Sequence, residues 1–277
     1  MNPTASTQRS AGDMLRQWRR HRRLSQLDLA CGAEISTRHL SFLESGRSQP
    51  SRDMIMRLGE YLDMPLRDRN QLLTAAGFAP MYRECAIEAP GFAVVLDSIR
   101  LLLRGLEHYP ALAVDRHWNL IESNQAAQRL LAQLAPRWLK PPINVLRASL
   151  HPDGLAPRIR NLPVWRAHLL DRLRRQIDAT HDPALISLWE ELRGYPGGIA
   201  TGHDIAADGV AVPMQLELGG TVLSMLSTTT VFGAPMDITL AELALEAFVP
   251  ADEATARALR EMAIAPLSLL AADAEIE

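Results

Sequence analysis

The segment from Leu24 to Arg47 constrains the fold of this chain more than any other part of the sequence. Ser25 and Ser36 each precede a short run with apolar residues at helical spacing, and serine is a favourable N-cap. Gly46 follows the second run, where glycine commonly ends a helix in a left-handed conformation. The segment is therefore predicted to form two short helices, residues 26–31 and 37–45, joined by a tight turn.

Three further amphipathic runs surround this pair of helices. Residues 12–22 place Met14, Leu15 and Trp18 on one stripe, opposite a run of arginines. A fourth helix is predicted to follow Ser51, and a fifth to cover residues 65–76, before Gly77. Five short helices within about 70 residues predict a compact all-α unit.

Residues 12–77 resemble the lambda-repressor-like, or Xre, helix-turn-helix family. The resemblance implies that the unit binds DNA. The chain departs from the family at Glu34, because glycine is usual in that turn and a positive φ is strained for glutamate. The matching motifs are Ser25-Gln26-x-x-Leu29-Ala30, Ile35-Ser36, Leu40-Ser41-x-x-Glu44-x-Gly46 and Pro50-Ser51.

The resemblance also implies which residues contact DNA. Gln26 is expected at a phosphate, and Thr37 and Arg38 at base edges in the major groove. Arg38 has the chemistry to donate two hydrogen bonds to a guanine. The alternative is that Arg38 is a solvated surface charge and Gln26 an ordinary polar residue at a helix start. Phosphate contacts that set register are expected from Ser41, Arg47 and Ser48.

Three nearby residues have other predicted roles. His39 and Phe42 are compatible with either kind of DNA contact or with neither, whereas Glu44 is predicted to bond within the unit.

Length and composition predict a second domain. A chain of 277 residues exceeds the usual size of a single domain. Residues 1–83 carry a net positive charge, while residues 84–277 are acidic and bring the whole chain to −3. The predicted domains are residues 1–80 and 91–277, with a linker over 81–90.

Several classes of protein receive little support from the sequence. No apolar run reaches the length of a membrane span, so a cytoplasmic protein with no membrane partner is expected. Cys31 and Cys85 belong to no metal-binding motif, so no disulfide, metal site or cofactor is expected. The usual phosphate-loop, serine-hydrolase and metalloprotease motifs are missing, which argues against an enzyme.

The C-terminal part alternates between helical and strand patterns. Strands are predicted in a hairpin over 111–123 and at 210–218, 221–232 and 238–249. Helices are predicted at 91–108, 125–134, 143–150, 157–178, 183–193 and 251–262. The apolar stripe of 91–108 is either a dimer or interdomain surface or plain core. The fold class is therefore multidomain, an all-α unit followed by an α+β unit. In the latter, helices gather on one face of a five-stranded antiparallel sheet, in the chain order of a PAS-like domain.

The whole chain resembles the MmyB-like transcription regulators, in which an Xre-type domain precedes a PAS-like ligand-binding domain. The resemblance implies a small-molecule sensor, with fatty-acid-like molecules as a plausible ligand class. The residues that carry it are Asn144-x-Leu-Arg147-x-x-Leu-His151-Pro-x-Gly154-Leu, Asn161-x-x-x-Trp165-Arg-x-His168-Leu-Leu, Ser227-Thr-Thr-Thr-Val-Phe-Gly233 and Phe248-Val-Pro-Ala-Asp252.

Four residues are candidates for the ligand site. Arg147 is the best candidate to hold a carboxylate, and Asn144, His151 and Trp165 are expected nearby. The alternative is that the polar residues tie loops and helix ends together and that Trp165 belongs to the core.

These observations together predict a homodimeric, sequence-specific DNA-binding regulator controlled by a small apolar ligand. Its target would be a pseudo-palindromic operator in double-stranded DNA. Two alternatives stay open for the C-terminal domain, which either only dimerises or binds a protein partner, or senses heme or a metal through His108, His117 or His151.

Overall fold

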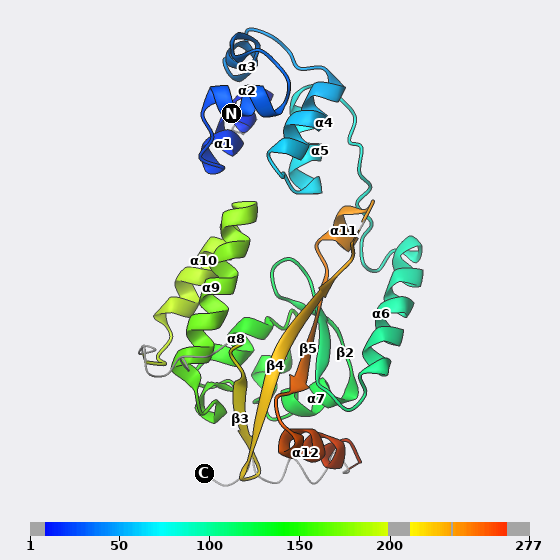
Figure 1. The fold of residues 1–277 in the computed structure, drawn as a ribbon. Helices are drawn as coiled ribbons and strands as arrows, with labels where there is room; N and C mark the ends of the chain where they lie inside the picture. Colours follow the sequence, from blue (N-terminus) through cyan, green and yellow to red (C-terminus); the bar gives the residue numbers. More distant parts are fainter. Residues whose placement is uncertain (1–8, 199–210, 234, 265–277) are drawn as a thin grey trace, which may run out of the picture. The chain divides into compact units, whose positions relative to one another are not determined.

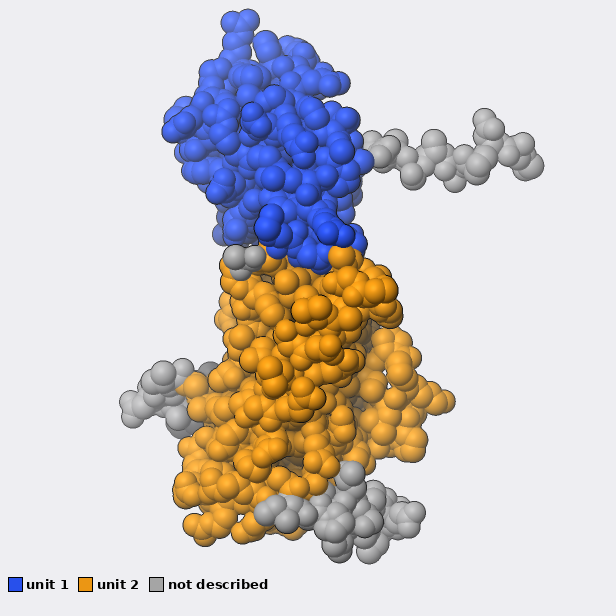
Figure 2. Space-filling model, turned by 90° about the vertical axis from the view of Figure 1, so that its right-hand side faces the viewer, with its two compact units in different colours: residues 1–84, 178–180, 236–238 blue, residues 85–177, 181–235, 239–277 orange. Residues whose placement is uncertain are grey.

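The computed structural model describes residues 9–198, 211–233 and 235–264 and divides into two compact units. The first unit contains the chain up to residue 84 with the short segments 178–180 and 236–238, and the second contains the remainder (Figure 2). Across the described ranges, none of the helices has both the length and the apolar character that a membrane crossing requires.

The first unit is built from five short helices, as the sequence predicts. Leu15, Leu29, Leu40, Ile55 and Leu72 come one from each helix and are fully buried in a shared core. Four of the five helices begin at a serine whose side chain accepts a backbone N–H. The helices are α1 (Ala11–His21), α2 (Gln26–Gly32), α3 (Thr37–Glu44), α4 (Arg52–Tyr61) and α5 (Leu66–Ala75).

All five helices end in the same backbone motif. One residue beyond each helix cap has a positive φ, and the next residue donates its N–H back into the last turn. Gly46 serves this role after α3, as predicted, with a φ of 72°. After α2 the position belongs to Glu34, at a φ of 56°, and the N–H of Ile35 donates to the carbonyl of Ala30 at 2.9 Å. The turn between α2 and α3 therefore keeps the standard geometry, although glutamate occupies the strained position.

The second unit is an antiparallel five-stranded sheet with helices, in the strand order β2-β1-β5-β4-β3 (Figure 1). The strands are β1 (Ala111–Val114), β2 (Leu120–Ser123), β3 (Met214–Leu218), β4 (Thr221–Val231) and β5 (Ala244–Pro250). The α-helices are α6 (Ala93–Gly105), α7 (Gln125–Leu131), α8 (Val145–Leu150), α9 (Leu162–Thr180), α10 (Pro183–Gly194), α11 (Ile238–Ala241) and α12 (Glu253–Ile264), and short 3₁₀ turns are η1 (Pro90–Phe92), η2 (Pro136–Leu139) and η3 (Ala156–Arg158).

Helices cover both faces of this sheet, so the prediction that they gather on one face was wrong. Leu112 and Val114 of β1 belong to the same core as α8, α9 and α10. Ala111 and Ala113, which alternate with them, pack in a separate core with Phe92, Ile99 and Leu103 from η1 and α6. The small alanine side chains leave room for α6 to lie close to the sheet.

The strand predicted over 238–249 is shorter than expected. Residues 238–241 form the helical turn α11, and the strand starts only at Ala244. Both neighbouring strands end opposite this residue, because Ala244 pairs with Val114 of β1 and with Val231 of β4. Residues before Ala244 therefore have no strand with which to pair, and the helical preference of leucine and alanine prevails.

Two other predicted elements also begin later than expected. Helix α9 starts at Leu162 rather than at residue 157, because Ile159 forms a bridge with Leu216 of β3 before the helix begins. Strand β3 starts at Met214, while residue 210 of the predicted strand lies outside the described residues.

Candidate DNA-recognition surface and ligand-binding domain

Helix α3 presents one face to the core and leaves its first turn exposed. Leu40 and Leu43 are buried, which fixes the rotation of the helix about its axis. The Ser36 hydroxyl accepts the N–H of His39 at 3.1 Å and caps the helix. Thr37 and Arg38 follow this cap and are exposed to solvent. The predicted base-reading residues therefore lie where an approaching groove would meet them.

The ring of Phe42 lies near both of the arginines that the sequence assigns to DNA. The guanidinium carbon of Arg38 lies 5.4 Å from the centroid of the Phe42 ring, and that of Arg47 lies 5.9 Å from it. These distances are within the range of cation–π attraction. The sequence left the role of Phe42 open. In the structure its ring is a shared contact for both guanidinium groups.

The remaining predicted DNA contacts lie around α3. Ser41 is half-buried within the helix, and its carbonyl accepts the hydroxyl of Ser45 at 2.8 Å. Ser48 is half-buried in the following turn, where its N–H donates to the carbonyl of Phe42 at 3.2 Å. The contacts that these serines make with phosphates stay predictions.

The buried side chain of Glu44 in α3 links this helix to α1 and α2 through hydrogen bonds. Its carboxylate accepts Nε and Nη2 of Arg19 at 2.6 and 2.9 Å, and Nε2 of Gln26 at 2.9 Å. Arg16 also donates to the Glu44 carbonyl. The prediction that Glu44 bonds within the unit is confirmed. Gln26, at the start of α2, is half-buried and is oriented by this carboxylate.

Electrostatics keep Glu44 ionised. Burial acts to raise the pKa of its carboxyl group, but hydrogen bonds from Arg19 and Gln26, together with the charges of Arg19 and Arg16, outweigh burial and lower that pKa. Hydrogen bonding to Glu44 correspondingly raises the pKa of Arg19. The ion pair therefore forms a permanent link between α1 and α3 at neutral pH.

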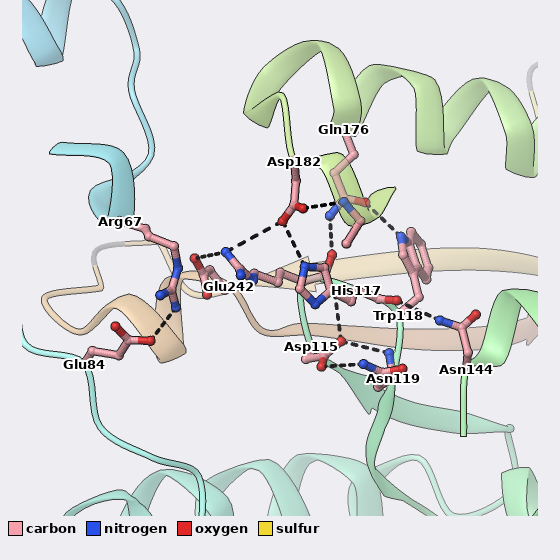
Figure 3. A network of polar contacts seen from close by, with 12 residues as sticks. Arg67, Glu84, Asp115, His117, Trp118, Asn119, Asn144, Gln176, Asp182 and Glu242 are labelled. Atoms are coloured by element: carbon pink, nitrogen blue, oxygen red, sulfur yellow. Dashed lines mark hydrogen bonds and ion pairs between the residues drawn. The ribbon is translucent and has the colours of Figure 1, made fainter. Parts of the chain in front are cut away.

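Asn144 belongs to a polar network at the turn between β1 and β2 (Figure 3). Its Oδ1 accepts the N–H of Arg147 at 3.1 Å and caps α8, while its Nδ2 donates to the carbonyl of His117 at 2.8 Å. In the same network His117 pairs with Asp182 at 2.9 Å, and Gln176 accepts Nε1 of Trp118 at 2.8 Å. Asn144 thus ties the turn to α8, in agreement with the structural alternative for this residue.

Arg147 projects from α8 toward α10. Its guanidinium pairs with the carboxylate of Glu191, with Nη2 of Arg147 2.7 Å from Oε2. Tyr195 donates its hydroxyl to the same carboxylate at 2.5 Å. The hydrogen bond from Arg147 lowers the pKa of Glu191, while burial and the bond to Glu191 raise the pKa of Tyr195 to about 12. A ligand carboxylate at Arg147 would share the guanidinium with Glu191 or displace it.

His151 and Trp165 both lie in aromatic clusters. The centroid of the His151 ring is 4.6 Å from that of Trp138 and 5.0 Å from that of Tyr195. Nδ1 of His151 accepts the N–H of Asp153 at 3.0 Å. Trp165 is buried and stacks on His168, with 5.3 Å between ring centroids. Tyr195 therefore contacts both His151 and the Arg147–Glu191 pair, whereas Asn144 points to the β1–β2 turn.

Comparison with protein-family models gives two matches that agree with this architecture. Residues 95–262 match the MmyB-like transcription regulator ligand binding domain. The chain belongs to the MmyB-like transcription regulators. Residues 10–72 of this MmyB-like regulator match a helix-turn-helix domain, so its first unit is a DNA-binding domain and its second a ligand-binding domain. No match was found among curated proteins.

The MmyB-like regulator also contains a buried ion pair that sequence reasoning missed. Arg172 of α9 donates from Nη1 to Glu246 of β5 at 2.7 Å and from Nη2 to the Thr229 hydroxyl at 2.5 Å. The guanidinium carbon of Arg172 also lies 4.6 Å from the centroid of the Trp118 ring. Glu246 is on the sheet face opposite Leu245 and Ala247, so strand alternation places it beneath α9. The strand alternation places Glu246 on a sheet face that a helix covers. This placement could have predicted a positively charged partner on that helix.

Proposed function

We propose that this protein is a sequence-specific, homodimeric transcription regulator whose DNA affinity is set by a small apolar ligand. The observation that carries the proposal is the exposed first turn of α3, where Arg38 is held against Phe42 in a helix-turn-helix unit attached to an MmyB-like domain. A guanidinium held in this way loses less conformational freedom when it docks on a base edge.

The division of labour on DNA follows the chemistry of the side chains. Arg38 reads a guanine and Thr37 contacts the adjacent base edge, since both lie at the exposed start of α3. Phosphate contacts come from Gln26, Ser41, Arg47 and Ser48. Two copies related by a twofold axis would read a pseudo-palindromic operator with half-sites about 34 to 36 Å apart.

The proposed ligand is an apolar molecule with an acidic head, such as a fatty acid. Support comes from the family description and from the core that α8, α9 and α10 share with the sheet, whose side chains are mainly leucine. Arg147 is the proposed carboxylate anchor, with Glu191 as the group that the ligand replaces. His151 and Trp165 are proposed to line the site, and Asn144 to support it through α8. The second unit is also proposed to be PAS-like. Its order along the chain, two strands, then several helices, then three strands, supports this proposal.

The protein is proposed to regulate rather than to catalyse, and to act in the cytoplasm, where it would have access to its operator. Regulation requires that the ligand bind the DNA-competent and DNA-incompetent forms with different affinities, because equal affinities shift no equilibrium. Because coupling between two binding sites is reciprocal, operator DNA must change the affinity for the ligand by the same factor by which the ligand changes the affinity for DNA.

Two experiments on the full chain test this function. Selection from random double-stranded DNA is expected to enrich an inverted repeat, and recovery of no shared sequence would contradict sequence-specific binding. Mass spectrometry of an organic extract of the natively purified chain is expected to detect about one apolar molecule per protomer. Its absence, together with unchanged operator affinity when fatty acids are added, would favour a domain that only dimerises or binds a partner.

A further inference from the structure

Helix α6 carries an apolar stripe that no described residue of the second unit covers. Val94, Leu101 and Leu102 are 75%, 65% and 51% exposed. Ser98 and Gly105 lie on the same side, since positions three, four and seven apart share one face of a helix. Within the second unit, α6 lies beside the edge strand β2 (Figure 1).

The stripe is separate from the face by which α6 joins the core. Ile99 and Leu103 point to the sheet and are 0% and 3% exposed. Arg100 adds a polar link, because its Nε donates to Glu122 of the edge strand β2 at 2.8 Å. Helix α6 is therefore held to the sheet by its inner face, and its outer face has a fixed direction.

One flank of the stripe carries an acidic and a basic side chain that would pair with each other between two antiparallel copies of α6. Asp97 and Arg104 are seven residues apart, so they lie two turns apart on the same side of α6. The Asp97 carboxylate pairs with Arg100 at 3.2 Å and keeps 73% of its side chain exposed, while Arg104 is exposed in the last turn. A second copy of α6, running antiparallel about a twofold axis near Arg100 and Leu101, brings Asp97 opposite the partner's Arg104. The same symmetry forms this ion pair twice.

We propose that two copies of this chain dimerise by antiparallel packing of α6 on α6, with Leu101 and Leu102 beside the twofold axis, Val94 toward the end of the contact and the Asp97 and Arg104 pairs along one flank. This inference rests on the homodimer in the proposed function and assigns its interface. A helix of 13 residues is only about 20 Å long, so the contact is modest and the dimer is expected to dissociate on dilution.

Sedimentation equilibrium of the full chain over a range of concentrations tests the apolar centre. Leu101→Glu places two carboxylates in the interface and is expected to weaken dimerisation by roughly a hundredfold. Ile186→Glu is the matched control, because Ile186 is also an exposed apolar residue, on α10, and its dimerisation should equal that of the unmodified chain. An undiminished dimer in Leu101→Glu, with circular dichroism unchanged, would overturn the proposal.

A charge exchange tests the antiparallel register. Asp97→Arg and Arg104→Asp should each weaken dimerisation by roughly fivefold, because each leaves like charges facing each other across the twofold axis. The double variant recreates both pairs in reverse and should recover dimerisation. Failure of the double variant to exceed the two single variants would overturn this register.

Binding to DNA separates this inference from the proposed function. Leu101→Glu should bind a single half-site as the unmodified chain does, and lose only the added affinity for two half-sites. Sequence-specific binding by a chain whose dimer survives Leu101→Glu would leave the regulator in place and remove α6 as its interface. Dimerisation through α6 without any selected DNA sequence would keep the interface and remove the proposed function.

Discussion

Arg19 of α1 donates two parallel hydrogen bonds to Glu44 of α3, from Nε to Oε1 at 2.6 Å and from Nη2 to Oε2 at 2.9 Å. The Glu44 side chain is only 1% exposed, so this pair operates with little solvent around it. Bidentate pairs of arginine and carboxylate fix geometry as well as adding energy. The exposed residues of α3 therefore depend on α1 for their position, although α1 itself precedes the two-helix motif.

Glu44→Ala is expected to destabilise the first unit by about 3 kcal/mol, because it leaves Arg19 and Gln26 without their buried acceptor. Hydrogen exchange of the α1 and α3 amides in the full chain would measure the loss locally. Asp13→Asn is the control, since Asp13 forms an exposed pair with Arg16 at 3.5 Å and should cost about 0.5 kcal/mol or less. Equal exchange in the two variants would contradict the role assigned to Glu44.

The same carboxylate makes the stability of this unit dependent on pH. Its folded pKa lies below the ordinary value near 4.5, so ionised Glu44 contributes stability above that value and loses it as the pH falls through the folded pKa. Glu44→Gln has no such ionisation. The difference in thermal unfolding midpoint between the unmodified chain and Glu44→Gln should therefore narrow as the pH falls from about 7 to about 3. A constant difference across that range would show that ionisation of Glu44 does not matter.

Arg38→Ala is expected to relax sequence preference at one base pair of each half-site. A bidentate contact from arginine to guanine is worth about 1 to 3 kcal/mol of discrimination, and alanine cannot replace it. Binding-site selection with the variant chain measures the preference directly. An unchanged selected sequence would remove Arg38 from the residues that read bases.

Arg47→Ala should weaken binding to all sequences alike and reduce the slope of log affinity against log salt concentration by about one, because a phosphate contact is lost.

Phe42→Leu keeps an apolar side chain but removes the ring that both arginines contact. It should therefore cost about 0.5 to 1 kcal/mol of operator affinity while the fold is kept. Titrations at several salt concentrations measure both effects, and full affinity in Phe42→Leu would show that the ring does not position the arginines.

Sequence patterns located the first unit more accurately than the details of the second. The caps at Ser25 and Ser36 and the stop at Gly46 are local signals, and the structure has all three. The outer face of α6 and the buried position of Glu246 depend on which elements meet in space. Local periodicity does not contain that information. The role of Phe42 was similarly hidden, because Arg47 follows α3 in the sequence and comes near the Phe42 ring only after the chain has turned at the end of the helix.

Glu34→Gly tests whether the turn between α2 and α3 stores strain. Glu34 has a φ of 56°, a region that costs an ordinary residue roughly 1 to 2 kcal/mol and glycine almost nothing. Glycine also makes the unfolded chain more flexible, which offsets about 0.5 to 1 kcal/mol of the gain. The variant should therefore be more stable by about 0.5 kcal/mol, with the hydrogen bond from Ile35 to Ala30 retained.

Gly46→Ala is the converse of this change, because Gly46 has a φ of 72° with no atoms within 4 Å of the position a Cβ would take. Only backbone strain opposes alanine there, so the first unit should lose about 1 kcal/mol. Chemical unfolding of the full chain, with hydrogen exchange of α2 and α3 to localise the change, would measure both variants. A loss of stability in Glu34→Gly would mean that the glutamate side chain makes a favourable interaction larger than the strain it carries.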